Sequence, residues 1–432
     1  MTAALCSAQE IGALRGRVQA RVDAAYEQLD ALYKHLHANP ELSYHEVKTS
    51  ARLASELRQQ GLEVTEKVGG HGVVAVLKNG AGPTVLVRAD MDALPVKEQT
   101  GLPYASRVTT TDDKGQEVNV MHACGHDVHM TCMVGVARVL GELKEFWRGT
   151  LVLIGQPAEE RVGGAKKMLA DGLFTRFPKP NYCLALHVGA DIPAGSVGYT
   201  EGFALANSDS VDIVVRGLGG HGAMPNKAKD PVVLAAQIVL ALQTIVSREI
   251  EPTEPAVVTV GSIHGGTKHN IIPDEVRLQL TVRSYTDAVR EQTLAAIERI
   301  ARGQALAAGI PEDRLPTVTV APEGAKATYN DPALSQRMAR VFAKWLGADK
   351  VLKRKATMGA EDFGLYGRTE DKIPILMFWL GSVDAKRWQE SQRGGAPLPA
   401  LHSPLYHPQP EPTIKTGVLT MTAAVLELMG KR

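Results

Sequence analysis

Carboxylate and imidazole side chains follow three apolar segments of the chain, each of which is predicted to be a buried strand. In an open α/β sheet, ligands bind outside the carboxyl ends of the strands, so these side chains are expected to meet at one edge. Adjacent acids at the end of a buried strand are costly unless a positive charge lies nearby. Glu159 and Glu160 therefore predict a cation site, in which one acid binds metal and its neighbour faces water. The segments and their side chains are 84–88 with Asp90 and Asp92, 150–155 with Glu159 and Glu160, and 182–186 with His187.

A thiol and an imidazole lie two positions apart in the segment HACGHDVH, where a loop is expected to enter a helix. Cys124 and His126 can bind one ion or two neighbouring ions, and Asp127 follows them directly. Thiolate and imidazole are ligands that suit zinc. His402, in the loop motif LHSPLYH, is a further candidate ligand.

Each of these residues also has an explanation that involves no metal. Glu160 is equally explained as a solvated acid at a helix start, where the helix dipole favours it. His187 is equally a hydrogen-bonded histidine at a strand end, and Cys124 a small buried hydrophobic residue. His122 and His129 are expected either to support the ligands or to lie on the surface.

The size and charge of the chain restrict its class. Its 432 residues exceed the ~250–300 at which single cores stop growing, so two domains are expected. Lys and Arg number 48 and Asp and Glu 47, and a net charge of +1 gives no general attraction to nucleic acid or anionic membranes. No apolar run reaches the ~18 residues that span a bilayer. The first residues lack the basic start and apolar block of a signal peptide.

The four cysteines are too few for a disulfide framework, and a reducing cytoplasm is the expected location. They are Cys6, Cys124, Cys132 and Cys183. Cys132 and Cys183 have apolar neighbours and are expected in the core.

Strands alternate with helices in the two outer parts of the sequence, and the nearly continuous apolar strands predict a mostly parallel, buried sheet. A Gly/Pro-rich stretch, 391–412, is expected to be a long loop. The predicted helices are 8–38, 46–61, 127–146, 164–171, 331–346 and 413–429, and the predicted strands are 73–77, 84–88, 150–155, 182–186 and 373–380.

The middle of the chain follows a different pattern, βαββαβ, which is the order of a ferredoxin-like unit. Asp230 and Pro231 form a cap and first-turn pair for its first helix. The strands are predicted at 209–216, 256–263, 275–285 and 316–321, and the helices at 231–249 and 287–308. We therefore expect a two-domain α/β protein, with a catalytic domain of residues 1–207 and 323–432 and an inserted satellite domain of residues 208–322.

Taken in order, several short motifs resemble those of the metallo-aminoacylase family, which includes hippurate hydrolases, N-acyl-amino-acid amidohydrolases and plant hydrolases of indole-acetyl amino acids. Each motif alone is weak, but the ordered set is specific, and the likeness covers nearly the whole chain. The motifs are HACGHD, GQPAEE, LHV, GGHGAMP, HNIIPD, GAEDF and LHSPLY.

The resemblance implies a two-metal centre in the catalytic domain, with Glu159 as general base. Relatives with peptidase-type sites have a histidine where this chain has Asp90, so Asp90 and Asp92 are expected, with Asp127, to orient the ligands rather than to bind metal. The thiolate favours zinc, and manganese, cobalt or nickel are alternatives. The implied ligands are Cys124, His126, Glu160, His187 and His402.

The satellite domain is expected to supply groups that bind the substrate. His221, flanked by glycines, is a candidate to stabilise the oxyanion, and Arg283 can bind the substrate carboxylate. Asn270 can hydrogen-bond the same group. The resemblance implies a homodimer or higher oligomer formed through this domain, with His221 and Asn270 reaching the partner subunit's active site. The alternatives are a tight turn with an exposed histidine and a solvated polar sheet face.

The predicted function is metal-dependent hydrolysis of the amide bond of a small N-acyl or N-aroyl amino acid. In this mechanism, Glu159 accepts the proton of the attacking water and donates it to the leaving nitrogen. Three alternatives remain: a dipeptidase or carboxypeptidase, a cysteine hydrolase with Cys124 as nucleophile, and a non-catalytic metal- or ligand-binding protein. The sequence does not identify the acyl group. The residues that either line its pocket or belong to the core are Tyr104, Met224, Met358 and Phe363.

Overall fold

The computed structural model describes residues 8–430, which form two compact units. The first unit contains the described residues up to Ala204, then Tyr329–Lys355 and the described residues from Asp362 onward. The second unit contains Leu205–Thr328 and Ala356–Glu361. We expected the segment Ala356–Glu361 in the larger domain. It belongs to the second unit, where the Ala206 amide donates to the Gly359 carbonyl at 2.8 Å.

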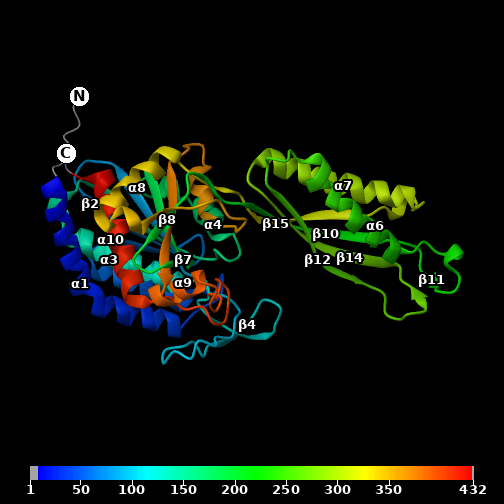
Figure 1. The fold of residues 1–432 in the computed structure, drawn as a ribbon, viewed down its shortest axis with the longest axis horizontal. Coiled ribbons are helices and arrows are strands. Elements are labelled where there is room, and N and C mark those ends of the chain that lie inside the picture. The colour runs from blue at the N-terminus through cyan, green and yellow to red at the C-terminus, as the bar shows by residue number, and fades with distance from the viewer. Residues whose placement is uncertain (1–7, 431–432) are drawn as a thin grey trace. The chain divides into compact units, whose positions relative to one another are not determined.

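The first unit is built on one eight-stranded sheet (Figure 1). Its central strands pair in parallel, antiparallel pairs follow on both sides, and the last pair at one edge is parallel again. The central strands are buried almost throughout, which confirms the predicted mostly parallel, buried sheet. The order across the sheet is β1 (Glu63–Val68), β2 (Gly72–Asn79), β6 (Gly149–Gln156), β3 (Thr84–Asp90), β7 (Tyr182–Pro193), β18 (Ile375–Val383), β8 (Val197–Tyr199) and β17 (Val351–Lys353).

Two helices that are apolar on nearly every side pack against this sheet, and a third covers them. α3 (His126–Glu142) contacts β3, α10 (Pro410–Met429) contacts β18, and α1 (Ala8–Ala38) packs on both helices. Glycines let α3 and α10 approach closely, since a Cβ on Gly135 would lie 2.5 Å from Val418 Cγ2. The remaining helices of this unit are α2 (Val47–Gln59), α4 (Gly164–Ala170), α5 (Leu173–Arg176), α8 (Pro332–Leu346) and α9 (Ala385–Gln392).

Several boundaries differ from the sequence predictions. β7 continues to Pro193, so His187 lies within a strand and not at its end. The reason is that β18 pairs with β7 along this extension, up to Val383 opposite Pro193. The predicted loop 391–412 is shorter, because α9 precedes it and α10 begins at Pro410. The hairpin β4 (Thr109–Thr111) and β5 (Glu117–Asn119) was not predicted.

The second unit has the strand order of a ferredoxin-like fold. Its antiparallel sheet runs β12-β14-β10-β15, and α6 and α7 lie together on one face of it (Figure 1). Side chains of β14 alternate between buried and exposed as predicted. Asp230 accepts hydrogen bonds from the amides of Val232 and Val233 and so caps α6. The elements are β10 (Asn207–Arg216), α6 (Pro231–Thr244), β12 (Ala256–Gly265), β14 (Glu275–Ser284), α7 (Asp287–Ala307) and β15 (Thr317–Ala325).

One helix of the described residues is long and apolar enough to cross a membrane by length and composition. It is Pro231–Glu249, with a mean hydropathy of 1.6. Polar residues such as Gln237 and Gln243 interrupt this helix, so the prediction that no unbroken apolar run reaches ~18 residues is not contradicted. Leu234, Ile238 and Leu242 fill the core of the second unit, while 33% of the apolar window is buried. An exposed apolar surface therefore remains on α6.

Candidate metal centre

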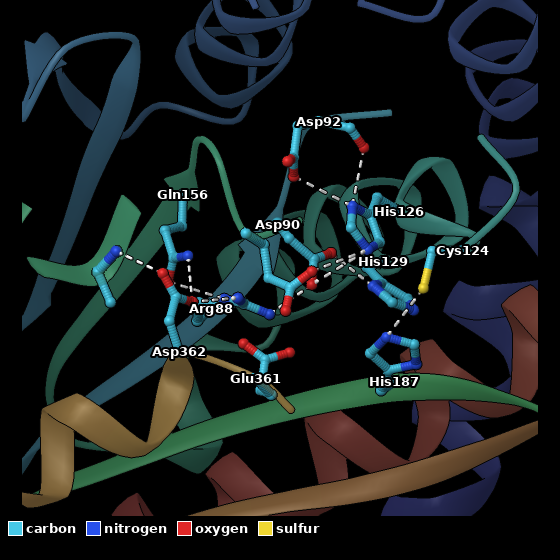
Figure 2. Close-up of polar contacts among 12 residues, drawn as sticks. Arg88, Asp90, Asp92, Cys124, His126, His129, Gln156, His187, Glu361 and Asp362 are labelled. Atoms are coloured by element: carbon cyan, nitrogen blue, oxygen red, sulfur yellow. Dashed lines mark hydrogen bonds and ion pairs between the residues drawn. The ribbon is translucent and has the colours of Figure 1, made fainter. Parts of the chain in front are cut away.

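Parallel strand pairing brings the candidate residues of the first unit to one edge of the sheet. Asp90 ends β3, while Glu159 and Glu160 follow β6, and His187 lies in β7. His126 begins α3, and Figure 2 shows it beside Asp90 and Asp92, with the Cys124 sulfur directed toward His187. Except for Glu160, whose side chain is 9% exposed, these residues are buried, whereas the side chain of His402 is 55% exposed. The structure thus assembles side chains that are far apart in the sequence.

The ligand atoms have the spacing expected around a metal ion. Nε2 of His126 is 3.9 Å from Glu160 Oε1, and Nε2 of His402 is 3.5 Å from the same oxygen. The Cys124 sulfur is 3.6 Å from His187 Nε2. Ligand atoms that sit about 2.0–2.3 Å from one ion lie roughly 3–4 Å from each other. In each of two groups, Cys124–Glu160–His402 and His126–Glu159–Glu160, the ligand atoms all lie within 4.8 Å of one another, so each group could hold an ion.

Two buried ligand atoms have no hydrogen-bond partner among the described residues: His126 Nε2 and Glu160 Oε1. Burying a polar atom unsatisfied is costly, so such atoms call for a ligand. The other nitrogen of His126, Nδ1, donates to the Asp92 carbonyl at 2.8 Å, and His187 Nδ1 donates to the Val188 carbonyl at 2.9 Å. Each imidazole therefore keeps an Nε2 lone pair for metal, as histidine ligands do. The site fits divalent metal.

His129 lies in the same cluster but is already fully hydrogen-bonded. Its Nε2 accepts from the Val188 amide at 2.9 Å, and its Nδ1 donates to Asp90 Oδ1 at 2.6 Å. No lone pair remains for an ion, so His129 supports Asp90 and is not a ligand. His129 and His122 are both buried, and the expectation that they could lie on the surface is wrong.

Arg88, a buried arginine that was not identified from the sequence, donates a hydrogen bond to Asp90. Arg88 donates to Asp90, to Gln156 at 3.1 Å and to Asp362 at 3.2 Å (Figure 2). Asp362, in the motif GAEDF, also accepts from the Ala165 amide at 2.9 Å. The signal in the sequence was an arginine within the apolar strand TVLVRAD, since an unpaired charge is rarely buried there.

Of the other two aspartates, Asp92 contacts a residue that carries a candidate ligand, and Asp127 contacts a buried histidine. Asp92 Oδ2 accepts from the Glu160 amide at 3.0 Å and from Ser43 Oγ at 2.6 Å. Asp127 Oδ2 accepts from His37 Nδ1 at 2.7 Å, and His37 Nε2 lies 3.1 Å from Glu98. Neither His37 nor Ser43 was recognised from sequence, because single polar residues between helices carry no periodic signal.

The electrostatics of the cluster favour a bound cation. Burial opposes a charge on His126, yet Asp90, Asp92 and Glu160 raise its pKa to about 10. Burial, reinforced by Glu160, raises the pKa of the Cys124 thiol well above its usual range. Without a cation this thiol stays protonated, and burial also lowers the pKa of the neighbouring His187. A thiolate–imidazolium pair for nucleophilic catalysis is therefore disfavoured here.

The candidate residues of the second unit lie on two parts of that unit. His221, in β11 (Gly220–His221), pairs with β13 (Ile271–Ile272), and the Gly222 amide donates to the Asn270 carbonyl at 2.9 Å. His221 and Asn270 are exposed neighbours. Arg283 is half-buried on β14, with Nη1 3.5 Å from the Met358 carbonyl.

The candidate acyl-pocket residues differ in their environments. Phe363 is fully buried in the core, and Tyr104 packs edge-on against the rings of Tyr33 and His37. Both are therefore explained by packing. Met224 is exposed and Met358 is half-buried, both in the second unit.

Known proteins match both the sequence and the fold. The model of peptidase family M20/M25/M40 matches residues 86–391. A hippurate hydrolase of Campylobacter jejuni is 39% identical over 345 residues, which cover 78% of this chain and 85% of that protein. Thermostable carboxypeptidase 2 of Saccharolobus solfataricus is 36% identical over 362 residues, with coverages of 82% and 85%. The structure of Bacillus subtilis YXEP, described as a dinuclear metal-binding peptidase, matches with a TM-score of 0.74 at 29% identity, over 94% of this chain and 100% of that one.

Proposed function

Because this chain belongs to peptidase family M20/M25/M40, we propose that it hydrolyses N-acyl or N-aroyl amino acids to a carboxylic acid and a free amino acid. The similarity to a hippurate hydrolase supports this substrate class. One observation carries the proposal: Glu159 Oε2 lies 3.8 Å from His126 Nε2, a buried ligand atom with no hydrogen-bond partner among the described residues. A site for binding alone does not need this second acid beside Glu160.

Two divalent metal ions are the cofactors that fit this centre. The dinuclear relative supports the number, and the soft sulfur of Cys124 favours zinc over manganese, cobalt or nickel. We propose that Asp90 and Asp92 orient the groups that bind the ions, since Asp90 lies 3.7 Å from His126 and Asp92 accepts from the Glu160 amide, and that Asp127 does so as the direct neighbour of His126 in α3. The ligands that we propose are Cys124, His126, Glu160, His187 and His402.

Such ions, when bound, lower the pKa of water and polarise an amide carbonyl. Glu159 accepts the proton of the attacking water and then donates it to the leaving nitrogen. Its place beside the ligands and its 5% exposure keep bulk water away from this proton. The same carboxylate therefore serves as base and then as acid.

The second unit supplies groups for the two ends of the substrate. His221 stabilises the oxyanion, and Asn270 and Arg283 bind the substrate carboxylate. The exposed side chains of His221 and Asn270 support this role, because neither is committed to the core of its own unit.

The chain acts as a homodimer formed through the second unit. Exposed apolar side chains gather on its first helix, where Leu240 is 72% exposed beside Val233 and Val232. β12 is also an edge strand of the sheet. A large apolar surface next to an open edge is typical of an interface between subunits.

The favoured alternative is a carboxypeptidase or dipeptidase, which the carboxypeptidase relative supports. Both substrate classes present an amide and a carboxylate to the same groups. We also propose a reducing, cytoplasmic setting, because the three cysteines within the described part of the chain are free. Cys6 lies outside the described residues.

A hydrolysis screen tests the function. N-acetyl, N-benzoyl and N-arylacetyl amino acids are compared with dipeptides, and metal content is measured alongside. We expect turnover of N-acyl amino acids that disappears on chelation and returns with zinc. Turnover of dipeptides alone would favour the carboxypeptidase, and activity that survives chelation but not thiol alkylation would favour a cysteine hydrolase. Retained metal with no turnover would favour a binding protein.

A further inference from the structure

The loop that carries the two adjacent acids has an unusual backbone. This carboxylate loop, residues 157–164, contains Ala158 with φ of 50° and Val162 with φ of 45°. Both angles are in the left-handed region, which residues with a side chain adopt rarely, and they flank Glu159 and Glu160 on both sides. Such strain persists only where the surroundings enforce it. The loop therefore needs a group that holds it.

The carboxylate of Glu46, at the connection between α1 and α2, is placed to do this. Its Oε1 accepts from the Ala158 amide at 2.7 Å and from the Tyr44 amide at 3.0 Å. Tyr44 also has a left-handed backbone, with φ of 69°. Glu46 is 0% exposed, and its Oε2 has no hydrogen-bond partner among the described residues. One buried oxygen thus joins two strained residues.

Helix capping does not explain this glutamate. Glu46 occupies the N-cap position of α2, but its side chain makes no capping hydrogen bond. Glu41 takes that role instead, since its Oε2 accepts from the Thr49 amide at 2.8 Å and from Thr49 Oγ1 at 2.9 Å. A buried acid costs stability, and here Glu46 Oε1 accepts from the loop and from the turn rather than from the first turn of α2.

Other contacts tie the same connection to the carboxylate loop. Ser43 Oγ donates to Asp92 Oδ2, which also accepts from the Glu160 amide. A Cβ on Gly163 would lie 2.0 Å from the Tyr44 hydroxyl, so the loop passes close to that ring. The connection between α1 and α2 therefore contacts the loop at its start and near its end, and it is linked to the middle of the loop through Asp92.

We propose that Glu46 is a positioning residue, which holds the carboxylate loop in the strained conformation that presents Glu159 and Glu160. This inference rests on the proposed roles of those two acids. The contribution of Glu46 is an acceptor oxygen, because Oε1 can accept from both backbone amides whether or not the carboxyl group is charged. An amide of the same shape can therefore replace the carboxylate.

The first test compares Glu46→Leu with Glu46→Gln. The leucine removes the acceptor, and we expect kcat to fall by about 10–100-fold, as when groups that orient metal ligands are removed, with KM changed little. Glutamine keeps an acceptor oxygen and is expected to stay within about 2-fold of wild type. Amide hydrogen exchange of residues 157–164, measured by mass spectrometry, should increase in Glu46→Leu and stay as in wild type in Glu46→Gln.

A second change and a control separate positioning from general stability. Ala158→Gly, added to Glu46→Leu, should recover part of the lost kcat, because glycine adopts a positive φ freely. Glu41→Ala removes the cap of α2 in the same connection and should lower the melting temperature while kcat is kept.

Each outcome is decisive. Normal kcat and normal loop exchange in Glu46→Leu would overturn the proposal, as would equal losses of kcat in Glu41→Ala. A loss in Glu46→Gln as large as in Glu46→Leu would show that charge is needed and would also overturn it. If wild type does not hydrolyse N-acyl amino acids, or if Glu159→Ala is fully active, the proposed function fails instead. The exchange measurement still reports whether Glu46 holds the loop.

Discussion

The two units of the molecule present their candidate functional residues in opposite ways. In the first unit, His126, Asp90 and Asp92 are buried, and their hydrogen bonds restrict the geometry of their side chains. In the second unit, His221 and Asn270 are exposed and are held mainly by backbone pairing. A metal site can therefore be inferred from buried atoms of one chain that lack hydrogen-bond partners. A substrate site made of exposed side chains depends also on the surface of the subunit that faces them.

The largest expected effect is a loss of kcat on mutation of the first unit. Glu159→Ala should lower kcat by about 10³–10⁵-fold, because a general acid–base group and its charge are removed together. Metal content should stay as in wild type, since Glu159 is not among the proposed ligands. Kinetics together with metal analysis check this. Normal turnover in the variant would break the assignment.

Removal of a ligand should act differently. Glu160→Ala and His187→Ala are expected to weaken metal binding by more than about 100-fold, which is the upper end for residues that only support ligands. Activity at limiting metal is then lost. Titration with zinc, followed by metal analysis after gel filtration, gives the affinity. Wild-type metal content in both variants would contradict the proposed ligand set.

A substitution on α6 tests the proposed role of the second unit as a subunit interface. Leu240→Glu places a charge on the proposed subunit interface and should convert a dimer to a monomer with at least about 10-fold lower activity, while metal content is kept. Leu306→Glu on α7 is the matched control, since Leu306 is also 51% exposed but lies on the other helix. Light scattering gives the mass. If the Leu240→Glu variant were monomeric and fully active, the partner subunit would contribute nothing to the site, and the metal centre would work without the proposed subunit interface.

The smallest expected effect is a pH-dependent change in the free energy of unfolding when His37 is replaced. Burial opposes the charge of His37, but hydrogen bonds to Asp127 and Glu98 raise its pKa to about 9, above the ~6.5 of the unfolded chain. The charged form then stabilises the fold fully below pH ~6.5, and this contribution, on the order of 3 kcal/mol, is lost as pH rises through about 9. The stability difference between wild type and His37→Gln should therefore shrink between about pH 6 and pH 9.5, as measured by denaturant unfolding.

A pair in the second unit provides the comparison for that experiment. Arg290 donates to Asp209 at 2.7 Å, and arginine stays charged over this range. The stability difference between wild type and Arg290→Gln should thus be independent of pH from 6 to 9.5. If both differences change in parallel, the effect at His37 does not come from its own titration.

Much of the fold followed from apolar periodicity, and much of the site from residue type. The helix at 8–38, the buried strands around Asp90 and the alternation along β14 were predicted because these elements bury regular patterns. The supports behind the site were not predicted. Arg88, His37 and Glu46 act through partners up to hundreds of residues away, and no local pattern encodes such pairing. The ligand roles themselves stay predictions.

The close packing of α3 on α10 has a consequence for how the protein is made. His126 stands at the start of α3, yet α3 rests against a helix at the end of the chain, and β18 lies in the middle of the sheet. On the ribosome, at about 5–20 residues per second, the metal centre cannot close until the last helix has emerged. The second unit is continuous from Leu205 to Thr328 apart from one short segment, so it can fold while synthesis is still under way. The second unit, although it is inserted within the sequence of the first, is therefore expected to complete its folding before the first unit does.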